Sequence, residues 1–139
     1  MATTYASFLT ALANVTVTGV ARRYTLAQSP PALEPRAADY PAQFVVPGGG
    51  GDGSVAAFGG AYKRTLTARI VIIIAAPGLD TSPANYADVV TMVDALNAGL
   101  VTAVATIGGS DTNAPTWNIT VPPDANPWRV EATVTVVGV

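Results

Sequence analysis

The stretch YKRTLTARIVIIIA, residues 62–75, decides the fold of this 139-residue chain. In its first half, apolar and polar residues alternate, which is the period-2 pattern of a strand with one wet face. From Ile70 onward both faces are apolar and rich in β-branched side chains, and Pro77 stops the run. We therefore predict a central strand whose far end is covered on both faces.

The residues before this strand predict its hairpin partner. Residues 41–47, PAQFVVP, form a short expected strand that a proline ends. The next stretch, GGGGDGS at 48–54, has few side chains to pack, so we expect a flexible, glycine-rich hairpin tip at about residues 48–60. Residues 55–58 could either lengthen the hairpin or lie in its loop. The glycines lack the Gly-Lys-Ser/Thr ending of a phosphate-binding loop, so they predict no nucleotide site.

Two amphipathic helices are predicted as covers for the sheet. The first begins after Thr3 or Thr4 as its N-cap, and its apolar stripe comprises Tyr5, Phe8, Leu9 and Leu12. The second begins at Pro83, and its stripe comprises Tyr86, Val89, Val90, Val93, Leu96 and Leu100. Asn97 and Gly99 indicate where it ends. We expect this second helix to be the main cover of residues 70–75.

Further strands are expected at residues 20–26, 100–107, 117–121 and 128–136, and the last two show alternation of apolar and polar residues. Neither an internal repeat nor a linker divides the chain, so residues 1–139 form a single expected domain. The fold class is α+β, with a mixed, mainly antiparallel β-sheet packed by two helices and a projecting β-hairpin.

The composition indicates a surface that other proteins cover. Half of the residues are hydrophobic and only 12% are charged, whereas an ordinary soluble domain has roughly 25% charged residues. A chain so poor in charge is expected to bury part of its surface against copies of itself or against a partner. The alternative is a monomer whose surface consists of Thr, Ser, Asn and Gly.

The residue inventory argues against catalysis. The chain has no Cys and no His, which excludes thiolate metal sites and the Ser-His-Asp and Cys-His types of machinery. Its acids are scattered, with no spacing typical of a dyad or a metal cage: Glu34, Asp39, Asp52, Asp80, Asp88, Asp94, Asp111, Asp124 and Glu131. We expect no enzyme activity, no catalytic residue, no cofactor and no metal.

No membrane association is expected either. The first residues lack a basic region followed by a continuous apolar region, so we predict no signal peptide. The apolar run at 70–76 is far shorter than the about 20 residues of a membrane-spanning helix. An intracellular product is therefore expected.

Five of the seven basic residues fall in two expected strands that could be neighbours: Arg22, Arg23, Lys63, Arg64 and Arg69. They allow two interpretations. They could form a basic strip on the inner wall of a ring, in nonspecific contact with passing DNA. Alternatively, they could be solvated strand positions or form intersubunit ion pairs with Glu34, Asp39 or Glu131.

The order of these segments resembles the small neck proteins of long-tailed, siphovirus-like bacteriophages, most of all tail terminator proteins. The segments that carry the resemblance are the amino-terminal helix, the arginine-bearing extended segment, PPAL, DYPAQFVVP, the hairpin with a glycine tip, the central strand, the second helix and the closing PWRVEATVTV.

The resemblance implies a virion protein of the tail or neck, present in the host cytoplasm during assembly. It implies a ring, typically a hexamer, that ends tail-tube polymerisation and joins the tail to the head connector. Copies of the chain, the tail-tube protein and neck proteins would be its partners. The alternatives are another neck or tail-tube subunit, or a small-ligand-binding β-rich module.

In such a ring, the extended hairpin would pair across subunits as an arm. The candidate interface residues of that arm are Phe44, Val46, Tyr62, Arg64 and Leu66.

Overall fold

The computed structural model describes residues 4–25, 40–48, 52–55, 62–74, 83–108, 114–122 and 129–137. At 52–55, 62–64, 83–86 and 108 it describes the backbone alone. Several sequence predictions lie outside the described residues, among them the strand residue Trp128 and the ion-pair candidates Glu34 and Asp39.

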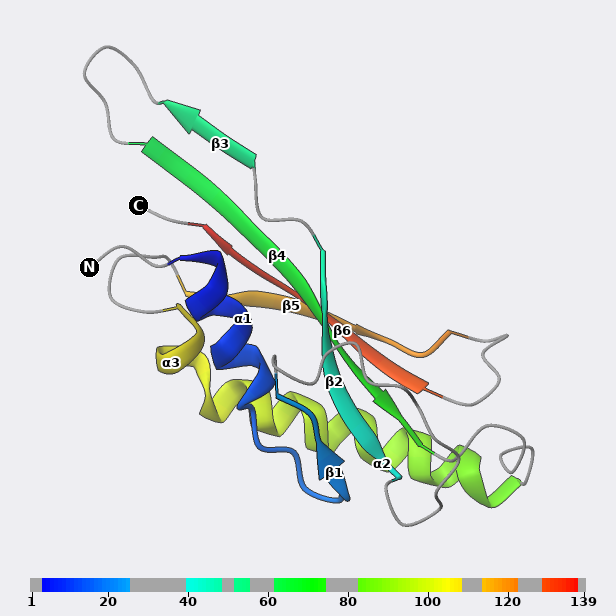
Figure 1. Cartoon of the computed structure of the whole chain (residues 1–139). Helices are drawn as coiled ribbons and strands as arrows, with labels where there is room; N and C mark the ends of the chain where they lie inside the picture. Colours follow the sequence, from blue (N-terminus) through cyan, green and yellow to red (C-terminus); the bar gives the residue numbers. More distant parts are fainter. Residues whose placement is uncertain are drawn as a thin grey trace.

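One sheet and one layer of helices make up the described structure (Figure 1). The helices are α1 (Tyr5–Ala13), α2 (Pro83–Thr102) and α3 (Val104–Gly108). The strands are β1 (Arg22–Arg23), β2 (Ala42–Pro47), β3 (Asp52–Val55), β4 (Tyr62–Ile73), β5 (Thr116–Thr120) and β6 (Arg129–Val137). Their order is β1-β2-β4-β6-β5, and β3 also pairs with β4. This arrangement confirms the α+β class.

The central strand of the sheet is β4, as its sequence predicts. On one side it pairs antiparallel with β6, from Thr65 to Ile73, and on the other with β2, from Ala68 to Ile73. β3 pairs antiparallel with β4 on the same side as β2, but at the opposite end of the strand. In the described part of the sheet the parallel pair is β1 with β2, so the sheet is mixed and mainly antiparallel.

The glycine-rich stretch is not a hairpin tip over its whole length. Asp52–Val55 is a strand paired with β4, so the expectation of a tip at 48–54 is wrong for residues 52–54. Residues 49–51 and 56–60, which also belong to the expected tip, lie outside the described residues. Glycine and aspartate are poor strand formers, but backbone pairing with the long β4 overrides that local preference here.

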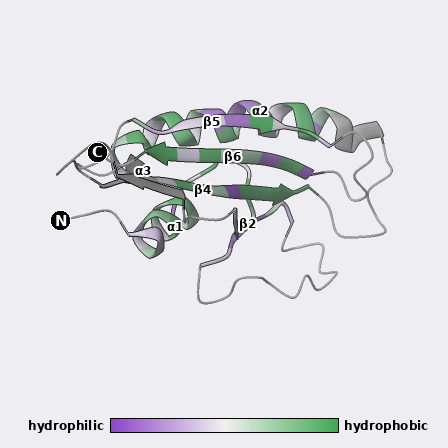
Figure 2. Cartoon of the chain, turned by 90° about the horizontal axis from the view of Figure 1, so that it is seen from above, coloured by the Kyte–Doolittle hydropathy of each residue, from purple (hydrophilic) through white to green (hydrophobic). Residues whose placement is uncertain are grey.

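The main core lies between the helices and one face of the sheet. β4 contributes Leu66, Ala68, Ile70 and Ile72, Ile74 follows directly after it, and β6 contributes Val130, Ala132, Val134 and Val136. The matching apolar bands on α2, β4 and β6 are visible in Figure 2. Phe8 and Leu12 of α1 are fully buried in the same cluster.

Local capping explains where α1 begins. Thr4 accepts a hydrogen bond from the Ser7 amide, and the Ser7 side chain bonds back to the Thr4 amide, which satisfies two amide groups at the helix start. α1 packs on β2 and β4, whereas α2 packs on β6. The sequence predicts α2 as the main cover of residues 70–75, and Ile70, Ile72 and Ile74 do share the main core with Leu96 of α2, but Leu12 of α1 belongs to the same cluster.

The second helix is longer than the sequence indicates. α2 continues to Thr102 and α3 follows, so the predicted helix end at Asn97 or Gly99 and the predicted strand at 100–107 are both wrong. Leu100 and Ile107 are buried in the main core at helical spacing, and this packing overrides the β preference of the intervening residues.

Gly99 has a packing role inside α2. A side chain there would place its Cβ 2.5 Å from the backbone oxygen of Thr16, which is closer than atoms can approach. The glycine therefore allows α2 to touch the segment that follows α1.

The face of the sheet opposite the three helices, called here the outer face, also has an apolar cluster. Tyr40, Ala42, Val71 and Ile73 are buried in it, and Tyr24, Phe44 and Val46 pack against it. The apolar end of β4 thus has cover on both faces, as the sequence predicts.

Candidate assembly surfaces

The five residues expected to form an interface arm have different environments. Phe44 and Val46 are half-buried against the cluster of the outer face. Leu66 faces the helices, opposite Val136, and is 2% exposed, so its expected place in a subunit interface is wrong. Tyr62 and Arg64 belong to the end of β4 that carries β3.

A two-stranded ribbon projects from the sheet, and it is called here the arm. It consists of β3 and residues 62–64 of β4, which pair as Gly53 with Arg64, Ser54 with Lys63 and Val55 with Tyr62. β6 first pairs with β4 at Thr65, and in the described structure no third strand flanks the arm (Figure 1). A two-stranded ribbon alone is marginally stable in water, so the arm gains stability from any strand added to it.

A short break separates β2 from β3 along β4. β2 ends opposite Ala68, and β3 begins opposite Thr65. Within this break the Tyr5 hydroxyl of α1 donates a hydrogen bond to the Thr67 carbonyl oxygen at 3.1 Å. A Cβ at Gly48 would come 3.1 Å from that same oxygen, so a glycine lets the chain leave β2 close to β4. The break marks the base of the arm.

The two outermost strands of the five-strand order differ in length and charge. β1 has two residues, both arginines and both exposed. β5 has five residues, TWNIT, without a charge or a proline, and in the described structure it pairs with β6 alone. Short edge strands and charged residues discourage pairing with another chain, whereas a longer uncharged edge permits it.

The basic residues at β1 make contacts within the chain. The Arg23 guanidinium donates to the Asn14 carbonyl oxygen and to the Thr16 hydroxyl, both at 3.1 Å. The Arg22 guanidinium lies 4.8 Å from the centre of the Tyr24 ring. β2 lies between β1 and β4, so the expectation that the two arginine-bearing strands are neighbours is wrong.

On the outer face, two arginines share one carboxylate. Arg69 and Arg129 each place a nitrogen 3.4 Å from Glu131 Oε1, and the two arginine side chains are about 40% exposed. The ion pair of Arg69 with Glu131 thus forms within the chain. Sequence reasoning missed Arg129, although Arg-Val-Glu in a strand places the first and third residues on one face. The side chains of Lys63 and Arg64 are outside the described structure.

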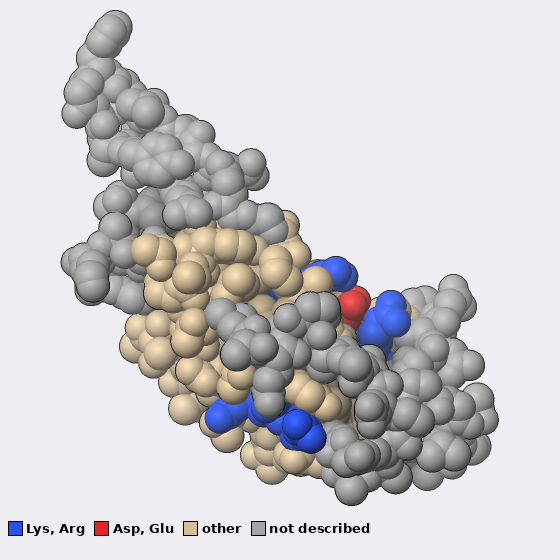
Figure 3. All heavy atoms as spheres, in the orientation of Figure 1, with Lys and Arg blue, Asp and Glu red and all other residues tan. Residues whose placement is uncertain are grey.

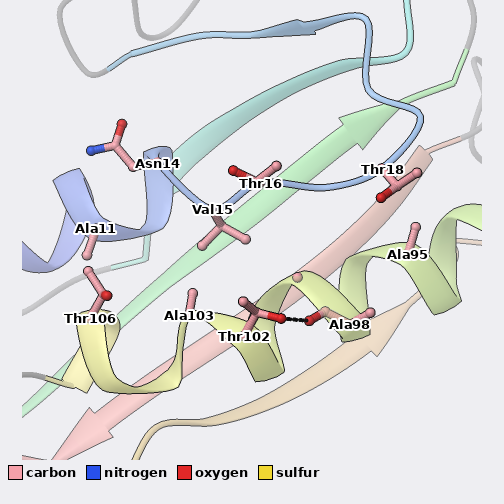
Figure 4. Close-up of a pocket in the computed structure, with 11 residues that line it drawn as sticks. Ala11, Asn14, Val15, Thr16, Thr18, Ala95, Ala98, Thr102, Ala103 and Thr106 are labelled. Carbon is pink, nitrogen blue, oxygen red and sulfur yellow. Dashed lines mark hydrogen bonds between the residues drawn. The ribbon is translucent and has the colours of Figure 1, made fainter.

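A groove lies in the helix layer. It has a volume of about 460 Å³ and lies between the end of α1, the segment that follows α1, and the helices α2 and α3 (Figure 4). Its walls carry small side chains: Ala11, Val15, Thr16, Ala98, Thr102 and Thr106 are examples. The Thr102 hydroxyl is occupied by a hydrogen bond to the Ala98 carbonyl oxygen. Among the described residues, no ionisable side chain lines this groove.

A smaller hollow of about 260 Å³ lies between residues 16–21, β1 and β2. Arg23 and Gln43 are among its lining residues. Gln43 is buried on the helix side of β2, and its Nε2 donates to the Val15 carbonyl oxygen at 2.9 Å. Its Oε1 has no hydrogen-bond partner among the residues that the structure describes.

Acidic groups do not gather at either hollow. Asp88 and Asp94 are exposed on α2, and Glu131 lies on the outer face. Over the described residues, no three His, Cys, Asp or Glu side chains are placed to hold a metal ion.

Within the described part of the chain, no helix has the length and apolar character needed to cross a membrane.

Neither the models of known protein families nor the curated protein sequences give a match to this chain.

Proposed function

We propose that this chain is a structural subunit of a bacteriophage virion, most closely a tail terminator. Copies of it form a ring at the head-proximal end of a long tail, end tail-tube polymerisation and join the tail to the head connector. The sequence resemblance leads to this proposal, and the projecting arm is the structural observation that supports it most. A ribbon without a third strand suits a subunit that completes its sheet by contact with another chain.

The chemistry of the surface is consistent with assembly. Most described atoms on the face in Figure 3 are neither basic nor acidic. Only 12% of all residues are charged, so little charge would have to be desolvated when copies associate. A non-enzymatic role is part of this proposal.

The alternative of a small-ligand-binding module has weaker support. Such a module would need an apolar pocket between helices and sheet, but in the described structure that space is filled by the main core. The larger groove lies among helices and has walls of alanine and threonine. Another neck or tail-tube subunit could have a similar arm and a similar surface with few charges, so only a functional test separates these roles.

Mass and imaging test the proposal. Light scattering and negative-stain images of the purified chain, alone and with tail tubes, should show a ring of uniform size, with six copies as the first expectation. The ring should sit at one end of each tube and prevent further growth. A stable monomer at micromolar concentration that forms no ring with or without tubes would refute the proposal.

A further inference from the structure

The two free strand edges of the described sheet run in opposite directions. β3 is antiparallel to β4, β6 is antiparallel to β4, and β5 is antiparallel to β6. β5 therefore runs the same way as β4 and opposite to β3. In two copies with the same orientation, β5 of one copy and β3 of the next run antiparallel, which is the geometry of a regular sheet. β5 lies at the level of residues 67–71 of β4 and β3 at the level of residues 62–65, so the next copy must also be shifted along the strands for the two edges to meet.

The half-buried side chains of β5 indicate that the sheet could continue beyond this strand. Trp117 pairs with Val134 and Ile119 pairs with Ala132, so both β5 residues face the helices. Val134 and Ala132 are fully buried, but Trp117 and Ile119 are only half-buried. One more strand beside β5 would cover them and extend the main core.

We propose that β5 of one copy pairs antiparallel with β3 of the next copy, so that the sheet continues from subunit to subunit. This inference rests on the proposed ring, since it specifies which edges make the ring contact. The contact is heterologous, because each copy gives one edge and receives another, and repeated rotation closes it into a ring.

A two-fold contact between two β5 strands explains fewer features of the structure. It would pair the uncharged edge, but it would leave both arms without a third strand and would stop at a dimer. Pairing β5 with β3 satisfies both exposed edges in every copy. β1 remains outside the contact, because it is two residues long and pairs with β2 rather than β4.

The absence of cysteine from the chain allows a direct crosslinking test. Ser54 of β3 pairs with Lys63, two residues before Thr65, so its register position belongs to the outer face. Thr116, Asn118 and Thr120 occupy outer-face positions of β5 and are exposed. Three double variants, Ser54→Cys with Thr116→Cys, Asn118→Cys or Thr120→Cys, sample three registers of the proposed pair.

Disulfides in these variants can form only between copies. β3 and β5 are three strand spacings apart in one copy, roughly 14 Å, which exceeds the approximately 7 Å limit between the Cα atoms of a disulfide. After mild oxidation, at least one double variant should give a ladder of dimer, trimer and higher species on a non-reducing gel. An equimolar mixture of the two matching single variants should give dimers only.

Controls separate the pairing from the ring itself. Ser54→Cys with Thr91→Cys, the latter on the exposed side of α2, should give no ladder. Asn118→Cys alone should not crosslink, and dimers from this single variant would overturn the proposal in favour of the two-fold contact. A ring by light scattering without a ladder at any of the three registers would overturn the proposed pairing but leave the proposed function standing. A parent chain that stays monomeric would overturn both.

Discussion

The two halves of β4 belong to one strand but have opposite surroundings. Residues 68–73 have a strand on each side and side chains buried on both faces, whereas residues 62–64 have β3 as their one described neighbour. The sequence also changes along this strand, from alternating residues before Ile70 to continuously apolar residues after it. A single strand can thus serve the fold at one end and remain available for assembly at the other.

The largest change in stability is expected from a cavity at residues 68–73 of β4, which have a strand on each side. Ile70 is fully buried between Val45 of β2 and Ala132 of β6. Ile70→Ala should lower the free energy of unfolding by about 2–5 kcal/mol, because apolar contacts are lost and the rigid sheet cannot close the cavity. Urea denaturation measures this change. Thr65→Ala, at the half-buried base of the arm, is the matched control and should cost under about 1 kcal/mol. If both variants lost the same free energy of unfolding, the two ends of β4 would not differ in their contribution to the fold.

Charges added to the edge of β5 should weaken association between copies but leave the stability of the folded chain nearly unchanged. Thr116→Lys with Thr120→Lys adds two charges to exposed positions of β5 and so gives it the protection that edge strands commonly have. We expect association between copies to weaken at least about tenfold, which corresponds to about 1.4 kcal/mol. Sedimentation at several protein concentrations measures this, and urea denaturation of the dissociated chain should show little change.

The control for that variant is Thr91→Lys with Thr102→Lys on the exposed side of α2. It adds the same charge away from every strand edge. If this control dissociates the ring as strongly as the β5 variant does, net charge rather than the β5 edge governs assembly.

Most of the helices and strands around residues 68–73 of β4 could be predicted from the sequence. Alternation and apolar runs located β4, β2 and β6, and the Thr4 cap and Pro83 located the starts of α1 and α2. These features depend on neighbouring residues in the chain, which is why local patterns reveal them.

The errors concern contacts between distant residues. Glycine is typical of a helix end, so the sequence indicates one at Gly99. Its role is instead close contact with the Thr16 backbone, and a local sequence pattern cannot reveal a contact with so distant a residue. The strand at 52–55 depends on the backbone of β4, and the ion pair of Arg69 with Glu131 depends on the register of β4 against β6. The outermost strands of the described sheet could not be predicted for the same reason, since an edge is defined by which strands pair.

The base of the arm should be sensitive to the Tyr5 hydroxyl. Tyr5→Phe removes the donor to the Thr67 carbonyl oxygen at the break between β2 and β3. Since the site is only partly buried and water can replace the donor, we expect a loss of about 0.5–1.5 kcal/mol in the free energy of unfolding. Hydrogen exchange should show faster exchange at residues 62–67 than in the parent chain. Unchanged exchange at these residues would show that this bond does not hold the base of the arm.

The smallest effect is expected at the arginine pair of the outer face. Glu131→Gln removes the carboxylate that Arg69 and Arg129 share at 3.4 Å, but both arginine side chains are about 40% exposed and can be partly hydrated instead, although Arg129 Nε itself is buried. We expect the free energy of unfolding to fall by less than about 1 kcal/mol, and by less still at high salt, because exposed ion pairs are screened. Urea denaturation at two salt concentrations measures this. A salt-independent loss above about 3 kcal/mol would mean that the three charged groups act as a buried network. The outer face would then contribute to the stability of the fold as the main core does.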